Sequence, residues 1–171
     1  KAVPALKASH ADKLDQFAQG KPGRGTPTHM HNAMISPLLP YAIKGAIWYQ
    51  GESNNGEGML YHEKMKALIA GWRSVWNKPD LPFYFVQLAP YKYRGDPKSL
   101  PGIWQAQLET LKVPHTGMAV TTDITTLTNI HPPNKQDVGK RLALWALAND
   151  YGKDKLVYSG PLFDKADHSD G

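Results

Sequence analysis

Three segments of the chain are dense in apolar, β-branched and aromatic residues. They are AIKGAIWY (residues 42–49), PFYFVQLA (residues 82–89) and GMAVTTD (residues 117–123). Each run is almost continuous instead of alternating with polar residues, which is typical of strands covered on both faces of a parallel sheet. The pattern therefore predicts three buried parallel strands.

Apolar side chains recur at helical spacing after each of these runs. They are Met65, Leu68, Ile69, Trp72, Val75 and Trp76 after the first run, Trp104, Leu108 and Leu111 after the second, and Val138, Leu142, Trp145 and Ala148 after the third. Intervals of three and four residues place each set on one face of a helix. The prolines of NKPDLP end the first helix, and Gly152 suits the C-terminal cap of the third.

The alternation of strands and helices predicts an α/β fold with a parallel sheet, helices on both faces and right-handed crossovers. The chain is long enough for one domain or a large part of one. We expect a final strand at KLVYSG (residues 155–160) and a short helix or loop at residues 29–45. The Gly- and Pro-rich GKPGRGTP (residues 20–27) is typical of an irregular surface connection.

Polar residues gather where each predicted strand ends. They are Gln50, Gly51, Glu52, Ser53 and Asn54 after the first strand, Gln87 near the end of the second, and Asp123, Asn129 and His131 at the end of the third and beyond it. Ligands of open α/β sheets bind outside the carboxyl ends of the strands, so we expect one shared site. A neutral imidazole suits a general base, and amide and backbone N–H groups suit an oxyanion. The set therefore fits acyl transfer by a serine hydrolase.

Each segment also fits a purely structural role. Residues 50–55 fit a turn followed by a helix cap, and His131 before two prolines fits a helix start. YKYR (residues 91–94) fits either a solvated loop or a sugar-binding platform with a guanidinium for a carboxylate. His29 and His31 resemble a metal pair, but no third ligand is near them in the sequence.

Composition narrows the class of function. The 41% hydrophobic and 20% charged residues are ordinary for a globular protein, and no apolar run approaches the roughly 20 residues of a membrane-spanning helix. The net charge of +5 is not arranged as a basic stripe, so neither nucleic acid nor a membrane is expected as a partner. The lack of cysteine excludes disulfides, thiolate metal sites and a cysteine nucleophile, and leaves the compartment open.

Three separated motifs resemble those of one enzyme family, in the right order. NAMISPLLPYAIKGAIWYQGESNN, LPFYFVQLAP and HPPNKQDVGKRLALWAL are similar to the second half of the catalytic domain of sialate O-acetylesterases, in the SGNH (GDSL-like) hydrolase superfamily. The resemblance is strongest over residues 32–151. It implies a flavodoxin-like, three-layer α/β/α sandwich, present here as a single domain (residues 1–171) that is incomplete at its N-terminus. It also implies removal of O-acetyl groups from sialic acid or a related acetylated sugar, without a metal or organic cofactor.

The resemblance also assigns roles to the polar residues. The loop from Gln50 to Asn54, with Gly51, Glu52 and Ser53 between them, lines the active site and helps to form the oxyanion hole, while His131 is the general base. Gln87 is expected to contact the substrate, because it lies near the end of the second strand. Asn129 stands where the family often has an acidic residue, and an amide does not stabilise an imidazolium as a carboxylate does. The imidazole is therefore oriented by Asn129, Asp123 or a backbone carbonyl, or it works in a Ser–His dyad.

The family's nucleophilic serine lies in a GQSNM block, which these 171 residues lack. We therefore expect the nucleophile in a preceding segment or a second chain, and Ser53 is the alternative within this chain. A catalytically inactive sugar-binding module and an acetylxylan-type polysaccharide esterase are the alternative functions. The resemblance favours a secreted or periplasmic location over a cytoplasmic one. An uncovered strand edge would favour association with another polypeptide.

Overall fold

The computed structural model describes residues 15, 18, 19, 28–93, 95, 96, 98–162 and 165–167. Within them, β1 (Ala46–Trp48), β2 (Phe83–Val86) and β3 (Thr116–Ala119) form a sheet in the order β1-β2-β3. Both strand pairs are parallel, with Ala46 opposite Phe83 and Phe83 opposite Thr116. The predicted parallel α/β sheet is confirmed, and each strand is shorter than its apolar run. The helices in this part of the chain include none that is both long and apolar enough to cross a bilayer.

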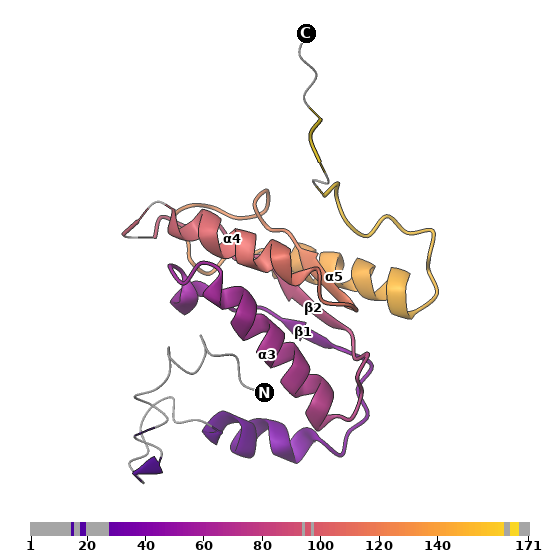
Figure 1. The fold of residues 1–171 in the computed structure, drawn as a ribbon. Helices are drawn as coiled ribbons and strands as arrows, with labels where there is room; N and C mark the ends of the chain where they lie inside the picture. The colour runs from indigo at the N-terminus through magenta and orange to yellow at the C-terminus, as the bar shows by residue number, and fades with distance from the viewer. Residues whose placement is uncertain are drawn as a thin grey trace.

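Helices cover both faces of the sheet and give three layers (Figure 1). Helices α3 (Leu60–Val75) and α4 (Ser99–Thr110) lie on one face, and α5 (Lys135–Asp150) packs on β2 and β3 from the other. The two sides of β2 therefore face two different clusters, because successive side chains of a strand point in opposite directions. Phe83 and Phe85 join the α3 and α4 side, while Tyr84 and Val86 join the α5 side.

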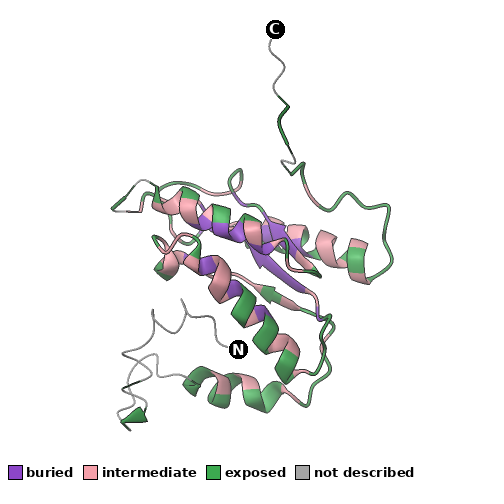
Figure 2. Ribbon diagram, in the orientation of Figure 1, coloured by how far each residue is buried: buried purple, intermediate pink, exposed green. Residues whose placement is uncertain are grey.

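The middle strand is buried on both faces, and β1 is not (Figure 2). Every residue of β2 is buried, whereas Ile47 in the centre of β1 is 70% exposed. The prediction of burial on both faces is therefore wrong for β1. It is an edge strand of the described sheet, and α5 covers mainly its neighbours.

The predicted apolar face of the first helix is confirmed in α3 except at Val75, which is 37% exposed at the end of the helix. Met65 and Ile69 are buried, and Leu68 and Trp72 pack against the same core. The helix ends at Val75 as the NKPDLP segment predicts, and Asn77 follows with a positive φ of 50°. Ahead of β1, residues 29–45 form the short helical turns η1 (His31–Ile35) and η2 (Ser36–Leu38), as expected.

The predicted apolar face of α4 is partly wrong. Its buried residues are Ile103, Ala106, Gln107 and Thr110, while Leu108 is 37% exposed. The reason is that Gln107 bonds to the backbone at the end of β2. Its Nε2 donates to the Val86 carbonyl (3.0 Å), and its Oε1 accepts from the Leu88 N–H (2.9 Å). A polar side chain thus occupies the core face because it satisfies buried backbone groups.

The predicted third helix is confirmed, but the final strand is not. Val138 and Leu142 of α5 are buried, and Gly152 ends this region with a φ of 68°. Residues 155–160 form no strand. Instead, the ring of Tyr158 packs on Trp145 with centroids 4.5 Å apart, so this segment turns toward α5 and does not pair with β3. The connection predicted at residues 20–27 lies outside the described residues.

Gly117 of β3 provides a test of how α5 packs on the sheet. A Cβ atom at this position would overlap the Trp145 ring and approach Tyr84 Cδ1 to 2.9 Å. We predict that Gly117→Ala lowers the free energy of unfolding by about 1–3 kcal/mol in a urea titration. Gly139→Ala on α5, where nothing lies within 4 Å, is the matched control and should raise it by up to about 1 kcal/mol. A Gly117→Ala chain as stable as the control would contradict this packing.

Candidate functional site

The loops that follow the three strands meet at one edge of the sheet. All three strands run in the same direction, so their carboxyl ends share that edge. Two contacts join the loops directly. The N–H of Lys92, after β2, donates to the carbonyl of Leu127, after β3 (3.0 Å). The ammonium of Lys135, at the start of α5, lies 4.4 Å from the ring centroid of Tyr49, at the end of β1.

The loop after β1 is held together by bonds among its own polar groups. The Nε2 of Gln50 donates to Oδ1 of Asn54 (2.7 Å), and the Gly51 N–H donates to Oε2 of Glu52 (3.0 Å). Residues Glu52–Asn54 form the short helical turn η3. Two of the expected oxyanion donors, the Gln50 amide and the Gly51 N–H, therefore already have acceptors within the loop.

Tyr61 in the first turn of α3 fixes this loop to the body of the domain. Its hydroxyl donates to the carbonyl of Gln50 (2.7 Å), and Gly51 is buried against Leu88 and Ile103. Burial raises the pKa of Tyr61 to about 12, so the hydroxyl remains a donor at neutral pH. No local sequence pattern marks Tyr61 as a site residue, because its role depends on a contact eleven residues away.

Tyrosine side chains form a second part of the site. Tyr93, after β2, has its pKa raised to about 12 by burial and by the charge of Glu52, with a further contribution from Tyr49. Burial and Glu52 also raise the pKa of Tyr49, whose hydroxyl is buried without a hydrogen-bond partner among the described residues. Tyr91 packs edge-on against Tyr93, with the ring centroids 5.1 Å apart. Tyr93 thus lies within reach of the charge of Glu52, and Tyr91 packs on Tyr93, while Arg94 lies outside the described residues.

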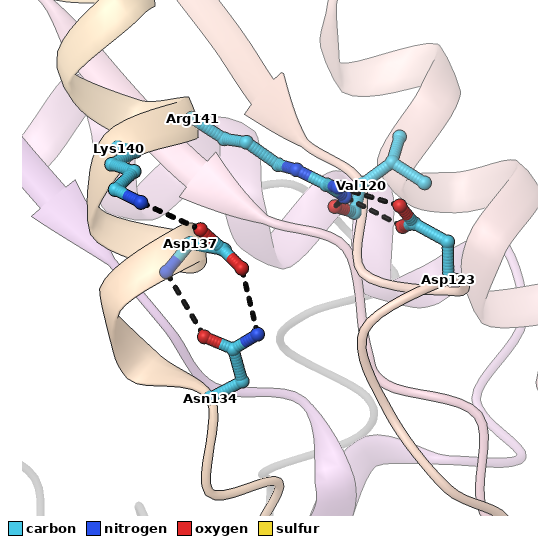
Figure 3. Close-up of polar contacts among 6 residues, drawn as sticks. All are labelled: Val120, Asp123, Asn134, Asp137, Lys140 and Arg141. Atoms are coloured by element: carbon cyan, nitrogen blue, oxygen red, sulfur yellow. Dashed lines mark hydrogen bonds and ion pairs between the residues drawn. The ribbon is translucent and has the colours of Figure 1, made fainter.

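The loop after β3 places His131 at the surface. Its backbone N–H donates to Oδ1 of Asn129 (2.9 Å), and no hydrogen bond of its imidazole is found among the described residues. The expected contact between Asn129 and the ring is therefore not seen, because the amide holds the backbone. Asp123 is also engaged elsewhere, since Arg141 binds both of its oxygens at 2.6 Å (Figure 3). These bonds hold the pKa of Asp123 at about 2.

The remaining predicted residues lie at the same edge of the sheet. Ser53 is exposed in η3, so its hydroxyl is accessible. Gln87 follows β2 directly, where its N–H donates to Ala119 (2.9 Å) and its carbonyl accepts from Thr121 Oγ1 (3.2 Å). The roles predicted for Ser53, Gln87 and His131 stay predictions. In the described part of the chain, no three His, Asp or Glu side chains are grouped closely enough to hold a metal ion.

Comparison with known proteins gives a consistent set of relatives. A family model described as carbohydrate esterase, sialic acid-specific acetylesterase, matches residues 7–148. Sialate O-acetylesterase from Rattus norvegicus is 38% identical over 168 residues, covering 86% of this chain and 31% of the relative. The Homo sapiens protein of that name is 37% identical over 153 residues, covering 78% of this chain and 29% of the relative. The chain thus spans about a third of the length of these curated relatives.

A solved structure supports the same relationship. The crystal structure of a carbohydrate acetylesterase from Xanthomonas citri matches with a TM-score of 0.79 and 43% sequence identity. The match covers 89% of this chain and 36% of that protein. At this level of identity, this chain shares its sheet and flanking helices with part of that protein.

Tyr61 generates a prediction about stability and pH. Its folded pKa of about 12 exceeds the ordinary value of 10.0, so the folded state keeps a proton that the unfolded state loses. The stabilisation is complete below about pH 10 and is lost as the pH rises toward 12. We predict that Tyr61→Phe lowers the free energy of unfolding at pH 7 by about 1 kcal/mol. We also expect the variant to lose less stability than the wild type between pH 10 and 12.

Urea titrations at several pH values measure both effects. Tyr41→Phe is the control, because Tyr41 is 70% exposed and its hydroxyl makes no hydrogen bond among the described residues. Equal slopes against pH for the wild type and Tyr61→Phe would contradict the assigned hydrogen bond and its burial.

Proposed function

Because this chain belongs to the carbohydrate esterase family of sialic acid-specific acetylesterases, we propose that it is the part of a sugar O-acetylesterase that carries the general base and the oxyanion loop. The proposed reaction is hydrolysis of the ester between an acetyl group and a sugar hydroxyl. The matched relatives are about three times as long as this chain. The activity is therefore proposed for the whole protein and not for these 171 residues alone.

The observation that carries the proposal is the meeting of the three strand-end loops. Lys135 lies over Tyr49, and Lys92 donates to Leu127, which supports a common site for the loops of His131 and Gln50. A general base and oxyanion donors are both needed for acyl transfer, and they must act on one carbonyl group. Neither feature alone would favour an esterase, because each also fits a structural loop.

In the proposed mechanism, a serine hydroxyl attacks the acetyl carbonyl while His131 accepts its proton. Backbone N–H groups of the 50–54 loop stabilise the oxyanion that forms. The imidazolium then donates the proton to the leaving sugar oxygen, and the acetyl-enzyme is hydrolysed by a water molecule that His131 activates. The backbone N–H groups of Glu52 and Ser53 have no acceptor among the described residues, so they are free to donate to this oxyanion.

We propose acetylated sialic acids as the substrate class. The family description supports this choice, and the net charge of +5 suits an anionic sugar. The Tyr91 and Tyr93 rings offer apolar surfaces next to the polar loop, against which the faces of a sugar ring can pack. The serine nucleophile is proposed to come from a segment outside these 171 residues, with Ser53 as the alternative.

His131 provides the direct test in the protein that contains this chain. We predict that His131→Ala lowers kcat for acetate release from O-acetylated sialic acid by about 10²–10⁴-fold, because the serine loses its base. Thr128→Ala is the control within the same exposed loop and should retain activity. Full activity of His131→Ala would remove this residue from the mechanism.

Two further measurements complete this experiment. Ser53→Ala should keep its activity if the nucleophile lies elsewhere, whereas a loss as large as that of His131→Ala would identify Ser53 as the nucleophile. Acetate release from acetylated xylan, measured beside the sialic acid ester, tests the substrate class. Faster release from xylan would contradict the proposed substrate and leave the esterase mechanism intact.

A further inference from the structure

The position of His131 depends on the backbone of a long loop. This loop runs from residue 120 to residue 134, between the end of β3 and the start of α5. Among the described residues the imidazole has no hydrogen-bond partner, so the backbone of the loop sets the position of the ring. Whatever holds the loop therefore also determines where the base stands.

One guanidinium on α5 binds the beginning of this loop (Figure 3). Nη1 of Arg141 donates to the Val120 carbonyl (2.5 Å) and to Oδ1 of Asp123 (2.6 Å), while Nη2 donates to Oδ2 of Asp123 (2.6 Å). This two-oxygen geometry is the strong and directional form of an arginine–carboxylate pair. The additional bond to a backbone carbonyl ties the main chain itself to the helix.

The same helix holds the other end of the loop. Oδ1 of Asn134 accepts from the Asp137 N–H (3.2 Å), and Nδ2 of Asn134 donates to Oδ2 of Asp137 (2.7 Å) (Figure 3). The start of α5 is thereby capped immediately after the HPP segment. Arg141 lies about two helical turns beyond Asn134. Side chains on α5 and at its N-terminal cap therefore bind both ends of the loop.

We propose that Arg141 is a positioning residue for His131, acting by clamping Val120 and Asp123 to α5. The inference rests on the proposed function, because it assigns His131 the role of base. Arg141 does not touch the reacting atoms, and its effect passes through the backbone between residues 123 and 131.

The clamp is expected to act on geometry more than on global stability. The Arg141 and Asp123 side chains are 31% and 62% exposed, and exposed ion pairs contribute little to the free energy of unfolding. A catalytic group displaced by about 1 Å, however, can reduce the rate about 10²-fold. Removal of the clamp should therefore lower kcat strongly and leave the melting temperature almost unchanged.

Hydrogen exchange followed by mass spectrometry tests the clamp without any assay of activity. We predict that Arg141→Met increases the exchange rates of the hydrogen-bonded amides of this loop, those of Ile124, Asn129 and His131, about tenfold or more, through local opening. Lys140→Met is the matched control, because Lys140 is one residue away on α5 and loses only an exposed ion pair with Asp137. If Arg141→Met does not fold, Asp123→Asn can replace it. This variant weakens the pair with Arg141 by removing the charge of an exposed carboxylate, and it leaves α5 unchanged.

Kinetics of the protein that contains this chain provide the second measurement. We expect Arg141→Met to lower kcat about 10–100-fold with less than a threefold change in KM, and Arg141→Lys to lie between it and the wild type. Exchange and kcat values equal to those of Lys140→Met would overturn the proposal. If the wild type released no acetate, the proposed function would fail, while loop exchange would still decide whether Arg141 holds the loop.

Discussion

Parallel pairing of the three strands is the constraint on which the site depends. Each strand runs in the direction of its neighbours, so the residues that follow Trp48, Val86 and Ala119 leave the sheet at one edge. β2 is the centre of this arrangement, because it is buried on both faces and the Gln107 side chain bonds to the backbone at its end. A change in strand order or direction would separate the loops, whatever residues they carry.

The loops at this edge are held by polar contacts that reach across the domain. Tyr61 of α3 fixes the Gln50 backbone, while Arg141 of α5 and Asn134, which caps α5, hold the two ends of the loop that carries His131. The helices on the two faces of the sheet therefore control opposite sides of one candidate site. Such support suits acyl transfer, since donors and base must be held in place before the substrate binds.

The local pattern of the sequence was enough to predict the strands, the helices and the edge at which polar residues gather. It failed where a long-range contact decides the outcome. Gln107 is buried because it bonds to β2, Ile47 is exposed because β1 is an edge strand, and Tyr158 packs on Trp145 instead of extending a strand. The pairing of Asp123 with Arg141 is a contact of the same kind, because the two residues lie 18 positions apart.

The proposed function requires the end of β1 and the start of α5 to adjoin at the candidate site. Nuclear Overhauser spectroscopy of Tyr49 and Lys135 tests it most directly, because the Lys135 ammonium lies 4.4 Å from the Tyr49 ring centroid. We expect cross-peaks between the Tyr49 ring protons and the Lys135 ε-methylene, with ring-current shifts of the lysine signals. Lysine shifts at their unfolded values, without cross-peaks to Tyr49, would contradict a shared site.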